Sequence, residues 1–336
     1  MSPILLVIGR NKELKRMISL VIPVFNMKQF LPRCMEKLLK QKGDYEIVLI
    51  DDGSTDGSGE LCDWYASEYS ALVRVVHKEN GGLSSARNTG IDAAQGEYVI
   101  FPDPDDWVEL NFVERLTVLQ KQYTPDLLCI GHYIDFDSHS VPANEGQHLK
   151  KLDKNQAQKA LVIVPAMNGF AWNKLYHMDI IQSHQLRFLD DVGTTEDLDF
   201  AYRYLQFCEK IVFSPEDRLY HYYQRNGAAT HSGFSRRKME SIRTYEKMIA
   251  TAIDKEMIRA AEEEICNTAI NLVWSFRESH IDDEEVWRQL RQYLGQYLKY
   301  YCVSQRYGIG RKIQAILAYY TPNLYVYLKR KINRKT

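Results

Sequence analysis

Carboxylates, glycines and one arginine gather at four points in the first 110 residues, each directly after a short apolar run. Two of these points are especially acidic: Asp51 and Asp52 open one, and Asp103, Asp105 and Asp106 form the other. A hard divalent cation such as Mg²⁺ prefers oxygen ligands and is usually held by one or two carboxylates together with substrate phosphates. These residue types therefore indicate a polar ligand site with a divalent cation as one expected component.

The apolar runs predict the elements that position these groups. Each run is short and rich in β-branched or aliphatic residues, and segments with helical spacing separate the runs. Strands that alternate with helices predict a mainly parallel α/β sheet covered on both faces. Ligands of such sheets bind beyond the carboxyl ends of the strands, so the polar segments should meet at one edge. The runs and the segments that follow them are Ile18–Val24 with Pro23–Asn26, Tyr45–Asp51 with Asp51–Gly57, Leu72–His77 with Asn80–Arg87, and Tyr98–Pro102 with Asp103–Trp107.

The pattern changes beyond residue 130. Residues 135–154 are polar and interrupted, which predicts a loop or an irregular hairpin. Helical spacing follows over 194–207, with Thr195 as the N-cap residue, and a strand is predicted at 219–223. From about residue 236 the pattern is helical nearly to the end, so we expect a domain boundary near residue 235.

Composition restricts the class of protein. The 336 residues are 45% hydrophobic and 26% charged, which excludes a disordered chain. No apolar stretch reaches the roughly 18 residues of a membrane-spanning helix, and no signal-peptide core is found. The six cysteines are scattered without a Cys-x-x-Cys pair, which argues against a zinc site and a secreted disulfide framework. We therefore expect a cytoplasmic protein.

The net charge of −1 hides an asymmetry. Residues 286–336 contain 11 Lys or Arg, no Asp or Glu, and nine of the 22 tyrosines, while the rest of the chain carries 32 basic and 44 acidic residues. Basic and aromatic residues on helices favour peripheral docking on an anionic membrane, here the inner face of the plasma membrane. The alternative is an ordinary packing helix with a solvated basic end. Nucleic acid is not an expected partner, because no binding motif accompanies the charge and the acidic body would repel phosphates.

Two other ligand motifs fit poorly. Asp52, Ser54, Asp56 and Gly57 match part of a calcium-binding EF-hand loop, but that loop needs a preceding helix where a strand is predicted. A Gly-x-x-x-x-Gly-Lys-Ser/Thr loop is absent, as is Gly-x-Gly-x-x-Gly after the first strand. P-loop NTPases and dinucleotide dehydrogenases are therefore disfavoured.

The four polar regions read SLVIPVFN at 19–26, IVLIDDGSTD at 47–56, NGGLSSARNTG at 80–90 and GEYVIFPDPDDW at 96–107. In this order, and with WNKLY at 172–176 and TED at 195–197, the chain resembles the family 2 glycosyltransferases of bacterial polysaccharide synthesis. The resemblance covers roughly residues 17–230 and implies the GT-A fold, a Rossmann-like, mainly parallel sheet flanked by helices. We expect three parts, namely an N-terminal extension (1–16), a GT-A domain (17–235) and a helical C-terminal appendage (236–336).

The resemblance implies an inverting transfer of a sugar from a nucleotide-diphosphate donor, with a UDP-sugar favoured, to a saccharide hydroxyl. A lipid-linked acceptor in cell-surface polysaccharide synthesis is expected, with Mn²⁺ or Mg²⁺ on the leaving diphosphate. Asp52 should accept the imino N–H of uracil and Arg87 should reach the phosphates. The competing interpretations are a helix-capping turn for Asp52 and a surface ion pair for Arg87. The residues that match the donor site are Pro23, Asn26, Asp52, Arg87 and Asp103, and those that match the metal ligands are Asp105 and Asp106, with Pro104 where serine is more usual.

An inverting displacement also needs a base that takes the proton of the acceptor hydroxyl. Asp197 matches the catalytic carboxylate of the family. Glu196 is the second candidate, although its side chain is expected to point elsewhere. The competing interpretation for Asp197 is an acid in the first turn of a helix that interacts with the helix dipole.

The later matches are looser. Trp172, Asn173 and Lys174 are expected to form the acceptor wall and to support a helix, and an ordinary buried Trp172 is the alternative. Arg225 and His231 lie in a polar stretch that can close over the diphosphate.

Two rival functions remain. A non-catalytic nucleotide-sugar-binding or scaffolding protein of the same fold would have no need of Asp105 and Asp197. A nucleotidyltransferase would need a Gly-rich, arginine-containing loop after the first strand, and residues 23–28 contain none.

Overall fold

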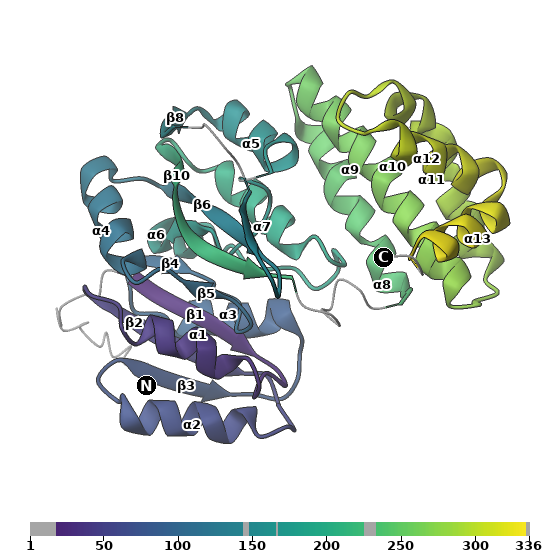
Figure 1. Cartoon of the computed structure of the whole chain (residues 1–336). Helices are drawn as coiled ribbons and strands as arrows, with labels where there is room; N and C mark the ends of the chain where they lie inside the picture. Colours follow the sequence, from purple (N-terminus) through teal and green to yellow (C-terminus); the bar gives the residue numbers. More distant parts are fainter. Residues whose placement is uncertain (1–17, 144–147, 166, 225–232, 334–336) are drawn as a thin grey trace, which may run out of the picture.

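A computed structural model describes residues 18–143, 148–165, 167–224 and 233–333. The described residues form a ten-stranded sheet in the order β3-β2-β1-β4-β9-β6-β10-β5, with β7 paired to β6 and β8 to β10 (Figure 1). The strands are β1 (Ile18–Val24), β2 (Tyr45–Asp51), β3 (Val73–His77), β4 (Tyr98–Ile100), β5 (Trp107–Val108), β6 (Leu127–Asp135), β7 (Ser140–Pro142), β8 (Lys150–Leu152), β9 (Lys174–His177) and β10 (Ile211–Tyr223).

The sheet is mixed, and its pairing confirms the predicted mainly parallel order of the strands. β1, β2, β3 and β4 are mutually parallel where they pair. β9 is antiparallel to both β4 and β6, and β10 is parallel to β6, so β6 and β10 run in the same direction as β1. The carboxyl ends of β1, β2, β4, β6 and β10 therefore share one edge of the sheet.

Helices cover both faces of the sheet. Alternate residues of β1 face opposite sides. Leu20 and Ile22 belong to the core layer that includes α1, α2 and α4, while Val21 belongs to the layer that includes α3, α5, α6 and α7. Two buried apolar layers result, one on each side. The helices are α1 (Leu31–Leu38), α2 (Ser58–Glu68), α3 (Leu83–Ala93), α4 (Phe112–Tyr123), α5 (Lys154–Ile163), α6 (Met178–Ser183) and α7 (Glu196–Leu205).

The C-terminal part is helical, and Figure 1 shows it beside α5 and α7 rather than over the edge that begins at β3. Met248, Met257 and Ala261 join the core layer that contains α7, whereas the remaining apolar residues of this part form a core of their own. No helix among the described residues is long and apolar enough to cross a membrane. The helices are α8 (Arg236–Met239), α9 (Ser241–Thr251), α10 (Lys255–Glu278), α11 (Glu284–Val303), α12 (Ile309–Tyr320) and α13 (Pro322–Asn333).

Two segments are more regular than their sequence indicates. The predicted loop or hairpin at 135–154 contains β7 and β8, which pair with β6 and β10 respectively. The strand predicted at 219–223 is the end of β10, which begins at Ile211. β6 and β7 form the predicted hairpin, whereas β8 pairs with the start of β10, and local sequence carries no signal for such a distant partner.

Candidate active site

Hydrogen bonds join the loops after β1 and β2. Asn26 has a φ of 54°, and its backbone N–H donates to Ser54 Oγ at 3.1 Å. Its side-chain Oδ1 accepts from the backbone N–H of Thr55 at 2.8 Å. The pairing of β1 with β4 ends at Leu20, before the buried Pro23. Proline has no N–H to donate, but at this position no hydrogen bond to β4 is lost. Both residues thus shape the edge at which the sequence places the nucleotide.

Asp52 is buried and holds the loop that precedes α3. Its carboxylate accepts from Lys78 Nζ at 2.5 Å, from the Gly81 amide at 2.9 Å and from the Gly82 amide at 2.7 Å. Gly82 has a φ of 85°, a conformation that favours glycine. A carboxylate offers about four lone-pair positions, so one further donor can still be accepted.

Arg87 on α3 joins two predicted parts of the site and is not a surface residue, since it is 1% exposed. Its Nη2 donates to Asp103 Oδ1 at 3.1 Å, and its Nη1 donates to Asp197 Oδ1 and lies 3.6 Å from Glu196 Oε1. Burial alone would lower the pKa of Arg87, but the negative charges of these three carboxylates outweigh burial and raise it. Arg87 is therefore a buried junction between the turn after β4 and α7, and the competing interpretation of a surface ion pair is wrong.

The acidic turn after β4 separates its carboxylates. Burial, together with the charges of Asp105 and Asp197, raises the pKa of Asp103 to about 7 against the lowering effect of Arg87. Asp105 is partly exposed, and its carbonyl accepts from Arg33 Nη2 at 2.6 Å. Asp103 and Asp105 thus supply carboxylates at an accessible part of the edge.

Asp106, which the sequence groups with the metal ligands, faces the interior instead. It is 1% exposed, and its two carboxylate oxygens accept from the Tyr220 hydroxyl at 2.7 Å and from the Tyr223 amide at 2.8 Å. The Tyr220 hydroxyl also accepts from the Asp103 amide at 3.0 Å. Burial and the neighbouring acidic charges raise the pKa of Asp106. In this arrangement Asp106 ties the acidic turn to β10.

Asp197 and Glu196 lie in the first turn of α7. Asp197 Oδ2 accepts from the Ala171 amide at 3.1 Å, and its Oδ1 is bound by Arg87. Glu196 does not point elsewhere, because it shares the Arg87 guanidinium, and burial with the charge of Asp197 raises its pKa to about 7. Thr195 is the N-cap residue as predicted, but its hydroxyl donates to the Val192 carbonyl at 2.8 Å rather than capping the helix.

Trp172, Asn173 and Lys174 are buried, so the alternative of an ordinary core tryptophan describes Trp172 better than an open acceptor wall. The Trp172 ring stacks on Phe170 at 4.7 Å and on Tyr220 at 4.5 Å between ring centroids. Lys174 Nζ donates to three backbone carbonyls of the loop before β9, at 2.6 to 2.7 Å. Burial lowers the pKa of Lys174 to about 8. These residues organise the loop that presents the Ala171 amide to Asp197.

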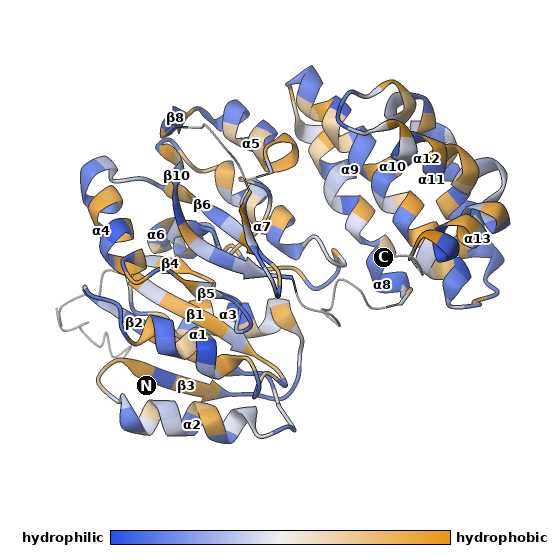
Figure 2. Cartoon of the chain, viewed as in Figure 1, coloured by the Kyte–Doolittle hydropathy of each residue, from blue (hydrophilic) through white to orange (hydrophobic). Residues whose placement is uncertain are grey.

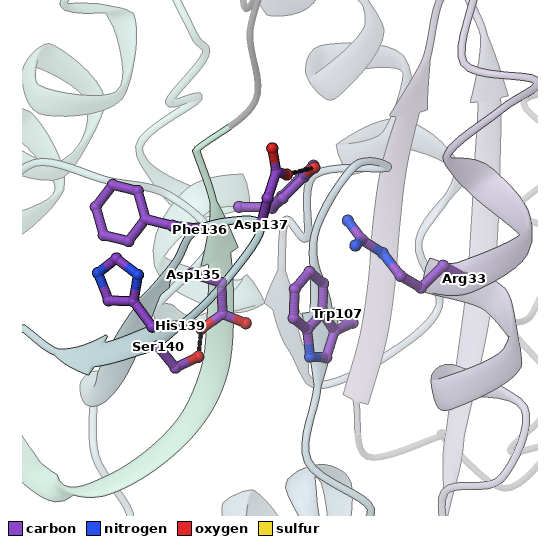
Figure 3. Close-up of a pocket in the computed structure, with 8 residues that line it drawn as sticks. Arg33, Trp107, Asp135, Phe136, Asp137, His139 and Ser140 are labelled. Atoms are coloured by element: carbon purple, nitrogen blue, oxygen red, sulfur yellow. Dashed lines mark hydrogen bonds between the residues drawn. The ribbon is translucent and has the colours of Figure 1, made fainter. Parts of the chain in front are cut away.

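An open pocket of about 410 Å³ lies beside the acidic turn, where sequence analysis placed no ligand (Figure 3). The Arg33 guanidinium lies 3.9 Å from the Trp107 ring centroid and 4.5 Å from the Tyr223 ring centroid. Phe136 stacks on His139 with a centroid distance of 4.8 Å, and Figure 3 shows this pair across the pocket from Trp107. The lining residues are Arg33, Trp107, Asp135, Phe136, Asp137, His139, Ser140 and Tyr223.

These pocket residues come from α1, β5, the β6–β7 hairpin and the end of β10. Trp107 ends the motif at 96–107, which was the available signal in the sequence. The pairing of β5 with β10 brings Trp107 to the end of β10, and the β6–β7 hairpin supplies the lining residues between 135 and 140. Arg225 and His231, predicted to close over the diphosphate, lie outside the described residues.

Comparisons with known proteins point to one family. A family model described as Glycosyl transferase family 2 matches residues 19–184. The chain is 33% identical over 218 residues to the uncharacterized glycosyltransferase EpsJ of Bacillus subtilis (strain 168), a match that covers 64% of this chain and 63% of EpsJ. It is 32% identical over 239 residues to glycosyltransferase GlyG of Streptococcus pneumoniae serotype 4, covering 66% of this chain and 75% of GlyG. The match thus spans less than two thirds of EpsJ but three quarters of GlyG.

Among solved structures, residues 1–349 of S. aureus TarS in complex with UDP-GlcNAc share the fold with a TM-score of 0.65. The sequence identity is 19%, and the match covers 84% of this chain and 81% of the TarS chain. The predicted α/β fold with a helical C-terminal part is confirmed by this likeness and by the sheet described above.

Proposed function

Because the chain belongs to the family 2 glycosyltransferases, we propose that it transfers a sugar from a UDP-sugar to a saccharide hydroxyl with inversion at the anomeric carbon. The observation that carries this proposal is the position of Arg87 between Asp103 and Asp197. One guanidinium brings a carboxylate of the acidic turn and a carboxylate of α7 to a common point. A donor diphosphate and a catalytic base would then face the same reacting centre. The UDP-GlcNAc complex of TarS supports a UDP-sugar donor.

The nucleotide half of the donor would lie over the ends of β1 and β2. Asn26 and Asp52 form the fixed polar wall, and the remaining acceptor capacity of Asp52 suits the imino N–H of uracil. Arg87 is charged and lies beside the acidic turn, so it would complement the negative charge of the phosphates.

Asp197 would act as the base. The acceptor oxygen attacks the anomeric carbon, the bond from that carbon to the diphosphate oxygen breaks, and UDP leaves with the electron pair. The hydroxyl proton passes to the Asp197 carboxylate, which Arg87 and the Ala171 amide orient. Arg87 already binds Asp103, Glu196 and Asp197, and an arriving diphosphate would offer it a further anionic partner. Its hold on Asp197 would then weaken, which frees that carboxylate to accept the proton.

A divalent cation, Mn²⁺ or Mg²⁺, fits this edge as an ion shared with the donor. No group of three or more His, Cys, Asp or Glu side chains among the described residues forms a complete metal cage. One or two carboxylates with substrate phosphates is the arrangement such ions commonly accept, and Asp105 with Asp103 would supply the carboxylates. The cation would supply Lewis-acid stabilisation of the leaving diphosphate. Asp106 would keep the turn in place.

The acceptor saccharide would occupy the pocket beside Trp107. Its aromatic faces and carboxylates combine the apolar and polar contacts typical of small-molecule sites, and Arg33 links it to Asp105. Phe136 is 40% exposed, so Phe136→Ala should raise the KM for the acceptor and leave the KM for the donor unchanged. Phe207→Ala is a matched control, because Phe207 is 41% exposed and also stacks on a histidine, remote from the pocket. Equal acceptor KM values for the two variants would show that the acceptor does not bind in this pocket.

We place the reaction in the cytoplasm, at the inner face of the plasma membrane, with a lipid-linked saccharide as acceptor. The test of the function is a thermal-shift panel of nucleotide sugars with Mn²⁺, with Mg²⁺ and with EDTA. A UDP-sugar should raise Tm, and more so with the metal. A panel in which no nucleotide sugar shifts Tm would contradict the proposal.

A further inference from the structure

The last two helices expose apolar residues to an unusual extent. Nine of the 20 large apolar side chains that are exposed among the described residues lie within 303–332. Figure 2 shows hydrophobic residues on α13, at the outer end of the helical part. The nine residues, which we call the outer apolar face, are Val303 at the end of α11, Ile309, Ile313, Ile316 and Tyr320 on α12, and Leu324, Tyr327, Leu328 and Ile332 on α13.

Helical spacing makes this face continuous along each helix. The four residues on α12 follow each other at intervals of four, three and four, and Ala315 and Ala318 are buried on the opposite side. On α13, Tyr325 and Val326 are buried and the exposed residues alternate with them at helical intervals. The small buried alanines let α12 pack closely, while its larger residues are left outside. Exposed apolar stripes on two neighbouring helices such as α12 and α13 mark an interaction site.

The charge around the face indicates its partner. Arg306 and Arg330 are paired with Glu264 and Glu278 of α10 at 2.8 and 2.7 Å, so part of the basic charge of the tail is already neutralised. Lys331 lies on α13 with its Nζ 4.8 Å from the Tyr327 ring centroid, directly beside the apolar face. Residues 286–336 contain no acid, so the remaining cations near this face have no acidic neighbour within the segment.

We propose that the outer apolar face docks on an anionic lipid surface, with α12 and α13 lying in the headgroup region. Apolar side chains, tyrosines and flanking lysines on one side of a helix form the profile of an interfacial helix. A symmetric contact between two copies of the chain through this face would bring two basic tails together, which disfavours self-association. The benefit of docking, which is to hold the active site near a lipid-linked acceptor, rests on the proposed function. The docking itself does not depend on that function.

Vesicle co-sedimentation of the full chain tests the proposal without any activity assay. Vesicles of phosphatidylcholine with phosphatidylglycerol should bind the chain more strongly than phosphatidylcholine alone. Raising the salt from about 0.05 M to about 0.5 M should weaken this binding, because screening acts on the charged component. Equal binding to both kinds of vesicle, or no binding to either, would overturn the proposal.

Paired variants locate the surface. Ile313→Gln with Leu324→Gln should weaken partitioning into anionic vesicles roughly tenfold, since interfacial binding scales with buried apolar area. The control is Ile253→Gln with Val118→Gln, which changes exposed apolar residues outside the face and should bind like the wild type. Circular dichroism melts check that both pairs are folded. Equal losses in the two pairs would overturn the proposal, as would a dimer seen by light scattering that only the first pair dissociates. UDP-sugar binding, measured separately, reports on the proposed function alone.

Discussion

Replacing Arg87 by methionine should destabilise the fold strongly and in a pH-dependent way. Methionine preserves much of the side-chain volume but leaves Asp103, Asp197 and Glu196 without their common cation. Removing one partner of a buried ion pair typically costs about 3–5 kcal/mol of unfolding free energy. The cost arises because the carboxylates left behind must either stay ionised in a poorly solvated site or take up protons.

The sign of the pH dependence follows from the raised pKa values. Asp103 and Glu196 already have a pKa of about 7 in the folded protein, and the loss of Arg87 would raise both further. A carboxyl with a raised folded pKa holds more protons folded than unfolded, so its contribution to stability falls as pH rises from the unfolded pKa through the folded one. The difference between Arg87→Met and wild type should therefore be smaller at pH 5 than at pH 8.

Urea unfolding followed by circular dichroism at both pH values measures this difference. Arg187→Met is the matched control, because Arg187 pairs with Asp92 at 2.7 Å on the exposed surface. Loss of such a pair should cost at most about 1 kcal/mol. Arg87 does not stabilise the three carboxylates if Arg87→Met lowers the unfolding free energy no more than Arg187→Met, or by the same amount at pH 5 and pH 8.

Three further predictions concern other parts of the site. Burial lowers the pKa of Lys174 to about 8, whereas a lysine in the unfolded chain has a pKa of about 10.4. The unfolding free energy should therefore rise as pH increases from about 8 towards about 10.4. Urea titrations of Lys174→Met should lack this rise. A Cβ added at Gly90 would clash with Val21 Cγ1 at 2.0 Å. Gly90→Ala should therefore lower the free energy of unfolding by about 1–3 kcal/mol or more, measured as a lower Tm. An unchanged Tm would show that α3 can move away from β1. In calorimetric titrations, Asp105→Asn should abolish the enhancement of UDP-sugar binding by Mn²⁺, whereas Asp106→Asn should chiefly lower Tm; the reverse pattern would exchange their roles.

The edge of the sheet was predictable because its signals are local. Asp52, Arg87 and Asp103 each follow an apolar run, and parallel strands bring such positions together whatever the details of packing. The resemblance to the family also indicated Asp197, although only the fold shows that Arg87 binds it.

The surroundings of Trp172, Trp107 and Asp106 could not be predicted from the sequence, for a physical reason. Trp172 has the same local pattern whether it lines a surface or lies in the core, and its burial depends on Tyr220, which is 48 positions away in the chain. The contact between Arg33 and Trp107 joins α1 to β5 and depends on the pairing of β5 with β10. Asp106 is similar, because adjacent carboxylates on a turn look equivalent in sequence until β10 supplies hydrogen-bond donors to one of them.

The proposed role of Asp197 as the base of a sugar transfer can be tested directly. The assay measures the transfer of radiolabelled sugar from the UDP-sugar identified in the nucleotide panel to lipid-linked saccharides extracted from cells. It compares wild type with Asp197→Asn and, as a neighbouring control, with Glu196→Gln. We expect Asp197→Asn to lower turnover by about 10²–10⁴-fold with unchanged affinity for UDP, and Glu196→Gln to retain much more activity. Turnover by Asp197→Asn equal to that of the wild type would contradict this role.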